Sequence, residues 1–212
     1  MIAAVVLAAG ESRRMGTQKL LLPFGDSTVI GAVVRAALAS RADRVLVVLG
    51  ADRDAVREEI ERVRASGRTG EGHGSDRLGF TVNDSYASGM LSSAQAGFRA
   101  LPTDAEAAVV MLGDQPFLPC AVVDAVIAAY RDSGRGIVIP VFQGRRGHPA
   151  LVDMKYRGEV LGLDPAEGLR QLVHAHPDDV REVEAGDADI LRDLDTPEDY
   201  QERVKPTFFE KK

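Results

Sequence analysis

A run of small and basic residues near the start of the chain has the composition of a phosphate-binding loop. It reads Leu7-Ala8-Ala9-Gly10-Glu11-Ser12-Arg13-Arg14-Met15-Gly16-Thr17-Gln18-Lys19. Small residues allow close approach of a ligand to the backbone, and Gly10 and Gly16 can adopt positive φ. Exposed N–H groups followed by cations suit a polyphosphate. The spacing matches neither G-x-x-x-x-G-K-[ST] nor G-x-G-x-x-G. An ordinary loop with solvated arginines is the alternative.

Asp114 is a candidate ligand for a metal that would accompany such a polyphosphate. It follows an apolar run and Gly113, whereas Asp195 ends a segment that directly precedes Thr196 and a predicted helix. Mg²⁺ takes oxygen ligands, commonly one or two carboxylates together with phosphates. Asp114 can face the phosphate loop if the strand expected at 107–112 lies beside the strand expected at 3–7, which precedes the loop. The alternatives are a turn aspartate at position 114 and simple helix-terminal charge at position 195.

Two further polar segments stand where open α/β sheets bind ligands. Residues 83–90 follow a short strand, although a plain polar turn accounts for them equally well. Residues 143–152 predict two short strands around a glycine turn, extending over the site. Their basic side chains, Arg145 and Arg146 with His148 nearby, are otherwise an exposed basic turn.

Apolar runs alternate with helical patterns along the chain, which predicts a three-layer α/β/α domain with a mainly parallel sheet. Strands are expected at 3–7, 45–49, 80–82, 107–112, 137–141, with Pro140 at an edge or bulge, and 180–184. Helices are expected at 29–40, from a cap at Asp52 to about 66, and at 91–100, 122–133, 167–175 and after Thr196. Residues 67–78 read as a surface loop and 190–195 as an extended segment. One domain over 1–205 and a tail over 206–212 are expected.

Composition limits the class of protein. The chain has 212 residues, a net charge of −6, 27% charged and 45% apolar residues, and one cysteine. The acidic balance argues against a nucleic-acid partner. No apolar run is long enough for a membrane span, and no signal peptide pattern is present. We therefore expect a cytoplasmic protein with no membrane association, in which Cys120 is a small apolar residue at a helix start.

The segment Leu7 to Leu21 resembles the signature loop of the MobA-like nucleotidyltransferases. Leu22-Pro23-Phe24-Gly25 and Gly113-Asp114-Gln115-Pro116 are similar to the cytidylyltransferase branch of that family. The resemblance implies a Rossmann-like fold of the nucleotide-diphospho-sugar transferase type. It also implies that the loop wraps a nucleotide triphosphate, that Arg14 and Lys19 neutralise it, and that Asp114 acts with them in catalysis. Asp114 and Asp195 would hold Mg²⁺.

The same resemblance implies roles for the remaining site residues. The nucleotide-binding residues it predicts are Leu7, Ala8, Ala9, Gly10, Ser12, Arg14, Gly16, Lys19, Asn83, Gly89 and Ser93. Ser88-Gly89-Met90-x-Ser92-Ser93 resembles the family's nucleoside-binding segment, so Ser93 is the foremost candidate for a base or ribose contact. The acceptor-binding residues it predicts are Gln115, Pro116, Arg146 and His148, with the basic side chains meeting an anionic pterin phosphate.

The reaction implied is transfer of CMP from CTP to the terminal phosphate of molybdenum-molybdopterin, with release of pyrophosphate. A molybdenum hydroxylase or its chaperone is the implied protein partner. Three alternatives stay open. They are the same chemistry with another nucleotide or phosphate acceptor, an NAD(P)H-dependent oxidoreductase of the nicotine blue type, and a non-catalytic chaperone that delivers cofactor.

Overall fold

A single mixed sheet forms the centre of the molecule. The computed structural model describes residues 1–66, 77–164, 167–186 and 188–204. Within these residues the sheet has eight strands. In spatial order seven of them are β10 (Val180–Glu184), β7 (Ile137–Phe142), β9 (Ala150–Asp153), β6 (Ala107–Leu112), β1 (Ile2–Ala8), β4 (Arg44–Leu49) and β5 (Leu78–Val82). The eighth, β8 (Arg145–Arg146), pairs with β7.

The apolar strand that precedes the phosphate loop lies in the middle of this sheet. β1 pairs in parallel with β4 on one side and with β6 on the other, and all seven of its residues are buried. An unbroken apolar run is expected of a strand covered on both faces. The parallel group β6, β1, β4 and β5 brings its carboxyl ends to one edge of the sheet. β9 alone among the ordered seven runs antiparallel to both neighbours, β6 and β7.

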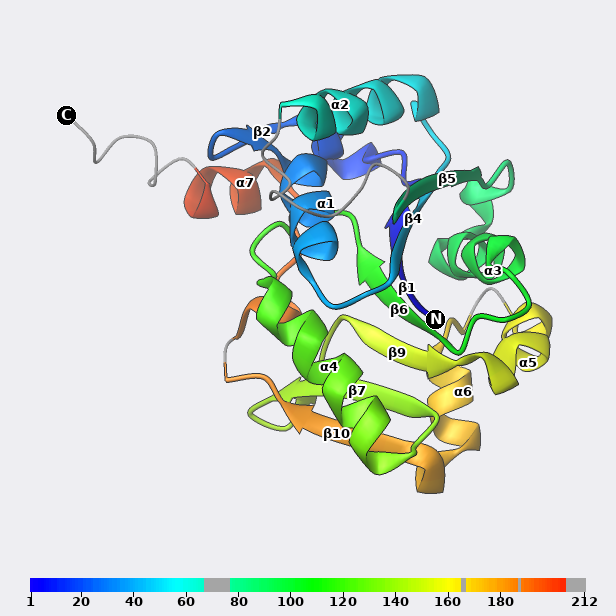
Figure 1. Ribbon diagram of the computed structural model, residues 1–212. Helices are drawn as coiled ribbons and strands as arrows, with labels where there is room; N and C mark the ends of the chain where they lie inside the picture. The colour runs from blue at the N-terminus through cyan, green and yellow to red at the C-terminus, as the bar shows by residue number, and fades with distance from the viewer. Residues whose placement is uncertain (67–76, 165–166, 187, 205–212) are drawn as a thin grey trace.

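Helices cover both faces of the sheet (Figure 1). One face is covered by α1 (Val29–Ala39), α2 (Arg53–Ala65) and α4 (Cys120–Ser133), whose apolar residues share one core cluster with β1, β4 and β6. The other face is covered by α3 (Met90–Ala100), α5 (Arg157–Gly162) and α6 (Arg170–Ala175), which belong to a second cluster. The predicted three-layer α/β/α architecture is confirmed.

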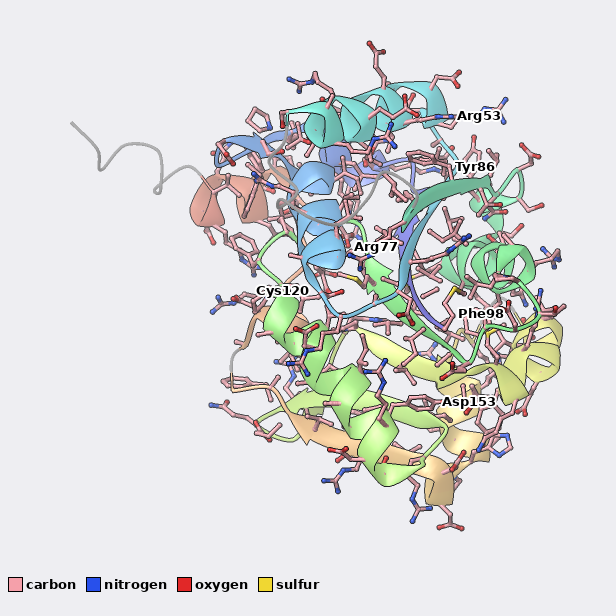
Figure 2. The ribbon with its side chains drawn as sticks, viewed as in Figure 1. Arg53, Arg77, Tyr86, Phe98, Cys120 and Asp153 are labelled. Atoms are coloured by element: carbon pink, nitrogen blue, oxygen red, sulfur yellow. The ribbon has the colours of Figure 1, made fainter. Side chains whose placement is uncertain are left out.

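Helix α3 packs unusually close to the central strand because one of its residues is a glycine. A Cβ added to Gly97 would lie 2.5 Å from Cγ1 of Val5, a separation that side chains do not tolerate. The next residue, Phe98, is fully buried in the core on the same side of the sheet (Figure 2). Close helix–strand contact of this kind fixes the start of α3, which faces the carboxyl edge.

Two of the predicted helix starts are confirmed in detail. The Thr28 hydroxyl accepts a hydrogen bond from the Gly31 N–H at the start of α1. At α7 (Pro197–Arg203), Thr196 and Asp199 form a reciprocal capping box, with Pro197 in the first turn. Such a box satisfies backbone donors that a helix start otherwise leaves unpaired. Cys120 is the first residue of α4 and is half-buried, as expected (Figure 2).

Two predictions about helices are wrong. Asp52 occupies the position before α2, but its backbone is left-handed at φ 51° and its carboxylate makes no capping hydrogen bond. The helix expected from Glu167 begins only at Arg170, because Gly168 adopts φ 73°, which a right-handed helix cannot include.

The predictions about Pro140 and about residues 190–195 also need correction. β7 is not an edge strand, since β10 lies on one side of it and β9 on the other. Along β7, Pro140 lies between the residues that pair with β9 and the residues that pair with β8. Its carbonyl accepts from the Gly147 N–H. Because Pro140 lies between these two pairings, its missing N–H interrupts neither hydrogen-bonded ladder. The segment expected to be extended instead starts with a 3₁₀ turn at Ala188–Leu191 that buries Ile190.

The excursion predicted over the site is only half present. β8 folds back on β7 through a turn at Gln143 and Gly144, both with positive φ, but β9 then enters the sheet itself. Of the loop predicted at 67–78, residues 67–76 lie outside the described part of the chain, and Leu78 already belongs to β5. The tail at 206–212 lies outside it as well. In the part of the chain that is described, no helix has the length and apolar content of a membrane span.

Candidate active site

The phosphate loop leaves β1 at the carboxyl edge and follows an irregular path. Its backbone is left-handed at Ser12 (φ 54°) and at Gly16 (φ 67°), on either side of a 3₁₀ turn at Arg13–Met15. Positive φ was expected at Gly10 and Gly16, and it is confirmed only at Gly16. Ser12 takes this conformation instead, which is uncommon for a residue with a side chain and therefore needs support from its surroundings.

Gln18 supplies that support. Its Oε1 accepts from the Ser12 hydroxyl at 2.8 Å, and its Nε2 donates to the Gly10 carbonyl at 3.2 Å and to Asp52 Oδ2 at 3.0 Å. The Lys19 N–H in turn donates to the Ser12 hydroxyl at 3.0 Å. One amide therefore ties together the two ends of the loop and the start of α2. The sequence analysis missed Gln18, because the motif leaves its position open.

Lys19 brings the two predicted carboxylates together. Its Nζ lies 2.6 Å from Asp114 Oδ2 and 3.0 Å from Asp195 Oδ1, and only 14% of its side chain is exposed. Burial alone would lower the pKa of Lys19, but the two carboxylates outweigh burial and raise that pKa above its ordinary value. Lys19 is therefore a fixed positive charge at neutral pH.

Strand order explains why Asp114 reaches the loop. β6 lies beside β1, with Leu112 opposite Leu7, so Gly113 and Asp114 leave the sheet next to the first residues of the loop. The Gly113 N–H donates to the Leu7 carbonyl at 3.0 Å, and a Cβ at position 113 would lie 2.7 Å from that oxygen. Glycine is required at position 113 for this close approach.

Asp195 reaches the site from the far end of the chain. The Leu194 N–H donates to the Asp114 carbonyl at 3.0 Å, and the Asp195 N–H donates to the capping carboxylate of Asp199 at 3.2 Å. Asp195 Oδ2 also lies 2.9 Å from Nη2 of Arg14, whose side chain is otherwise mostly exposed. The start of α7 thus holds Asp195 against the loop.

The charges around Asp195 are strongly coupled. Burial would raise the pKa of Asp195, but Lys19 and Arg14 lower it below the ordinary range. Burial and the neighbouring Asp195 charge raise the pKa of Asp193, which also lines the site. The cluster therefore carries two cations, Lys19 and Arg14, against a locally concentrated set of carboxylates.

This donor set fits a divalent cation of the magnesium type. Asp114 and Asp195 offer hard oxygen donors that already converge on one positive charge, the Lys19 ammonium. Among the described residues no group of three or more protein ligands is preassembled for a metal. Mg²⁺ and similar cations are commonly held by one or two carboxylates, with waters and substrate phosphates completing the shell. The residues present match this pattern.

A cavity of about 450 Å³ opens over the loop and these charges. Its lining includes ten of the predicted site residues, namely Leu7, Ala9, Gly10, Ser12, Arg14, Lys19, Gly89, Ser93, Asp114 and Asp195. It also includes residues that were not predicted for the site, namely Arg13, Leu20, Tyr86, Met90, Leu112 and Asp193. Three predicted nucleotide-binding residues, Ala8, Gly16 and Asn83, do not line it. Apolar and charged side chains thus line the same cavity, whose volume lies in the range of small-molecule binding sites.

The predicted nucleoside segment also contributes to the lining of this cavity. Ser93, in the first turns of α3, lines the cavity and is buried. Its hydroxyl accepts from Asn83 Nδ2 at 3.0 Å, and the same amide donates to the Ser92 hydroxyl at 2.8 Å. Asn83 is itself buried behind these serines. It therefore orients them and does not face the cavity.

A second cavity, of about 510 Å³, adjoins the first and shares Leu7 and Met90 with it. The predicted acceptor residues Arg146 and His148 line it. Arg146 is exposed, and its Nε lies 2.7 Å from a carboxylate oxygen of Glu182.

The other two predicted acceptor residues lie elsewhere. Gln115 and Pro116 are buried and line neither cavity. Gln115 Oε1 is enclosed without a hydrogen-bond partner. The structure therefore does not bring them to the space where an acceptor would bind.

The fold and this arrangement of charges define a nucleotidyltransferase. The chain belongs to the family of the MobA-like NTP transferase domain, whose model matches residues 4–180. Asp193 and Asp195 therefore lie beyond the matched region.

Three curated relatives cover nearly the whole chain. The molybdenum cofactor cytidylyltransferase of Escherichia coli K12 is 27% identical, covering 94% of this chain and 93% of its own length. The purine catabolism protein PucB of Bacillus subtilis is 32% identical over 92% of both chains. The nicotine blue oxidoreductase of Paenarthrobacter nicotinovorans is 29% identical over 93% of both. The relatives are therefore similar to this chain over nearly its whole length but carry different functional names.

Solved structures of one mycobacterial protein are also similar. Rv0371c of Mycobacterium tuberculosis H37Rv is 29% identical with a TM-score of 0.78, covering 96% of this chain and 97% of its own. A structure of Rv0371c in complex with manganese is 28% identical with a TM-score of 0.75, covering 96% and 98%. A member of this structural group therefore binds a divalent metal.

Proposed function

We propose that the protein transfers CMP from CTP to the terminal phosphate of molybdenum-molybdopterin and releases pyrophosphate. The observation that carries this proposal is the convergence of Lys19 and Arg14 with Asp114 and Asp195 in the first cavity. A triphosphate and a divalent metal need both signs of charge in one place, and this site supplies both. The second cavity, which adjoins the first, gives room for the acceptor.

In this proposal the protein acts by positioning and by charge. The phosphate loop binds the triphosphate through its backbone, while Lys19 and Arg14 neutralise the leaving pyrophosphate. Asp114 and Asp195 would hold Mg²⁺. When bound, this ion would neutralise negative charge on the phosphates of the nucleotide. The acceptor phosphate is already an anion and attacks the α-phosphorus directly, so no protein nucleophile is required. Catalysis of this kind depends on orientation and electrostatic stabilisation.

The two cavities meet at Leu7 and Met90, and we place the reacting phosphates at this junction. The nucleoside would lie against Ser93 and Gly89, and the acceptor would lie on the side of Arg146 and His148. Such an arrangement brings the attacking and leaving groups to opposite sides of the α-phosphorus, as in-line displacement requires.

The choice of CTP and of the pterin acceptor is supported by resemblance. Residues 22–25 and 113–116 are similar to the cytidylyltransferase branch, and the Escherichia coli relative carries that name. The implied partner is a molybdenum hydroxylase or its chaperone, in the cytoplasm.

Pyrophosphate release tests the proposal. The assay compares CTP, GTP, ATP and UTP with Mg²⁺, each with and without molybdenum-loaded molybdopterin. We expect release with CTP that depends on the pterin. Release with a different nucleotide would keep the chemistry and change the specificity. Failure with every nucleotide, in a folded protein that binds CTP, would contradict the proposal.

A second candidate is an NAD(P)H-dependent oxidoreductase, because one relative of nearly equal length and identity is a nicotine blue oxidoreductase. Consumption of NAD(P)H with nicotine blue, without release of pyrophosphate from any nucleotide, would favour it. Tight binding of molybdopterin with neither reaction would favour a cofactor-delivery chaperone.

A further inference from the structure

Ser12 and Asp52 both have a left-handed backbone although neither is glycine, and one side-chain amide contacts both of them. Ser12 has φ 54° and Asp52 has φ 51°. Gln18 Oε1 accepts from the Ser12 hydroxyl at 2.8 Å, and Gln18 Nε2 donates to Asp52 Oδ2 at 3.0 Å. A left-handed backbone is unfavourable for a residue with a side chain, so it persists only where the surroundings enforce it. The two strained residues therefore belong to one hydrogen-bonded unit.

The neighbours of the Gln18 amide fix which of its ends faces Ser12. On the Nε2 side lie the Asp52 carboxylate and, at 3.2 Å, the Gly10 carbonyl, and both of these groups can only accept. On the Oε1 side lies the Leu20 N–H, at 3.4 Å, which can only donate. The amide nitrogen must therefore point to Asp52 and the amide oxygen to Ser12.

This orientation commits the only proton of the Ser12 hydroxyl. A hydroxyl has one O–H donor and two acceptor lone pairs. The proton goes to Gln18 Oε1, and a lone pair accepts the Lys19 N–H at 3.0 Å. A phosphate oxygen is an acceptor and needs a donor, which the Ser12 hydroxyl cannot supply in this arrangement. Ser12 lines the first cavity, but its side chain is used to hold the loop.

Asp52 makes its contact with Gln18 instead of capping its own helix. Aspartate is among the residues that most often cap a helix start through the side chain. The Asp52 side chain makes no capping hydrogen bond to α2. The turn before α2 lies against the loop, since the Ala51 N–H donates to the Ala9 carbonyl at 3.1 Å and a Cβ on Gly50 would lie 2.7 Å from that oxygen. The start of α2 therefore supports the loop at the expense of its own cap.

The backbone of Ser12 decides the direction of the cationic part of the loop. Ser12 directly precedes the 3₁₀ turn at Arg13–Met15, and its carbonyl accepts the Met15 N–H at 2.9 Å. Arg13 and Arg14 both line the first cavity. A change from a left-handed to an extended φ at Ser12 would redirect this turn and move both arginines.

We infer that Gln18 and Asp52 are positioning residues that hold the phosphate loop in its ligand-binding shape before a ligand arrives. Asp52 orients the Gln18 amide, and the amide holds Ser12 in the left-handed conformation. Polyphosphate is then bound by backbone N–H groups and cationic side chains, without the Ser12 hydroxyl. A loop that is already shaped loses less freedom when it binds. This inference rests on the proposed function only for the presence of a polyphosphate in the loop.

Binding of inorganic tripolyphosphate with Mg²⁺, measured by isothermal titration calorimetry, tests the inference without a base or an acceptor. Gln18→Leu should weaken binding about 5- to 30-fold, the scale of one left-handed residue that has lost its support. Adding Ser12→Gly to Gln18→Leu should restore most of this loss, because glycine adopts positive φ without support. For the same reason Ser12→Gly should bind more tightly than Ser12→Ala. A hydroxyl that bound phosphate would make both equally weak, and no rescue would occur.

A double-mutant cycle tests Asp52. Asp52→Gly removes the carboxylate and keeps the left-handed backbone accessible. It should weaken binding about 3- to 10-fold, the scale of one hydrogen bond, although loss of a negative charge near an anion would by itself strengthen binding. In Gln18→Leu it should weaken binding no further, since both residues act through one contact. The control is Asp54→Asn, in the first turn of α2, which should change binding about twofold or less.

The inference and the proposed function can fail separately. Absence of tripolyphosphate binding in the wild type, absence of rescue by Ser12→Gly, or an equal loss from Asp52→Gly with and without Gln18 would overturn the inference. If the rescue occurs but no nucleotide releases pyrophosphate, the loop is held as inferred and the proposed reaction is wrong. If CMP transfer occurs without the rescue, the reaction is correct and the role given to Gln18 is wrong.

Discussion

The Lys19 ammonium lies between two carboxylates, in the position where a divalent cation would bind if the lysine were absent. Its Nζ contacts Asp114 and Asp195, and Arg14 adds a second contact to Asp195. The carboxylates of Asp114 and Asp195 are therefore paired with cationic side chains of the protein itself. A metal that arrives alone must compete with a buried ammonium, whereas a nucleotide offers that ammonium a new partner. Metal and nucleotide should consequently bind more tightly together than separately.

Lys19→Met tests this competition. Without the ammonium, Asp114 loses its cationic partner and Asp195 keeps only Arg14, so Mn²⁺ without nucleotide should bind at least several-fold more tightly than to the wild type. Turnover should fall about 100-fold, the scale of one lost electrostatic contact in a transition state. Electron paramagnetic resonance of free Mn²⁺ measures the first effect, and pyrophosphate release the second.

Lys155→Met is the control, since Lys155 pairs with Asp179 away from both cavities. Equal Mn²⁺ affinity in the wild type and Lys19→Met would show that Lys19 does not compete with the metal. An unchanged turnover would remove Lys19 from the catalytic residues.

Asp179 gives a pH-dependent prediction for stability. It accepts from the Tyr156 hydroxyl at 2.6 Å and pairs with Lys155 at 2.8 Å. Burial would raise its pKa, but these contacts lower the pKa to about 2. Because the folded-state pKa lies below the unfolded value of about 3.9, the contribution is present above about pH 4 and is lost as pH falls towards 2.

Asp179→Asn should therefore be less stable than the wild type by about 1–2 kcal/mol at pH 7, after allowance for partial exposure. The difference should shrink at pH 3, where the wild-type carboxyl begins to lose its advantage. Urea unfolding at the two pH values measures it. A difference of the same size at both would show that the carboxylate charge is not responsible.

At the scale of elements, the site depends on how closely helices and strands approach the carboxyl edge. Gly97 lets α3 lie against β1, and Gly113 lets the end of β6 lie against Leu7. Ser93 of α3 and Asp114 after β6 both line the first cavity. A change in spacing at either glycine would move a functional side chain.

Gly97→Ala should destabilise the protein by about 1–3 kcal/mol, since its methyl group would overlap Val5. The matched control is Gly158→Ala in α5, where nothing lies within 4 Å of the added carbon. There alanine should be neutral or stabilising by up to about 1 kcal/mol, because it favours the helix. Thermal and urea unfolding compare the two. Equal effects would mean that close packing of α3 on β1 is unimportant.

The elements also show what the sequence can predict. The central strand β1 and the start of α7 after Thr196 depend on local patterns, and both predictions are confirmed. The meeting of Asp114 with the loop could be predicted only on the condition that their strands are neighbours. The bracing by Gln18 and the burial of Gln115 depend on residues distant in the chain, so no local pattern could reveal them. The same holds for the lowered pKa of His148, which comes from the burial of its ring in the folded protein.

At the scale of the whole molecule, the first cavity joins the beginning, middle and end of the described chain. The contact between Lys19 and Asp195 spans 176 residues of sequence, and Tyr200 in α7 donates to the Pro23 carbonyl at 2.6 Å. A ligand bound there contacts segments that separate on unfolding. Binding should therefore stabilise the entire fold and not one part of it.

Mg²⁺ with CTP at about 100 times its dissociation constant should stabilise the protein by about 2.7 kcal/mol, which corresponds to roughly 5–10 °C in Tm for a chain of this size. Asp195→Asn should show a smaller shift at the same ligand concentration. Differential scanning calorimetry gives both values. A full shift in Asp195→Asn would place Asp195 outside the ligand site.

The position of Asp195 in the sequence also has a consequence for biosynthesis. The phosphate loop is translated well before Asp114. Asp193 and Asp195, which lie beyond the family match, follow later still. A nascent or prematurely terminated chain that stops before them would display the cationic loop without one of its two counter-charges. Nucleotide could then meet an incomplete site, but the proposed metal-binding pair of Asp114 and Asp195 would not exist until the segment that carries Asp195 had been synthesised and docked.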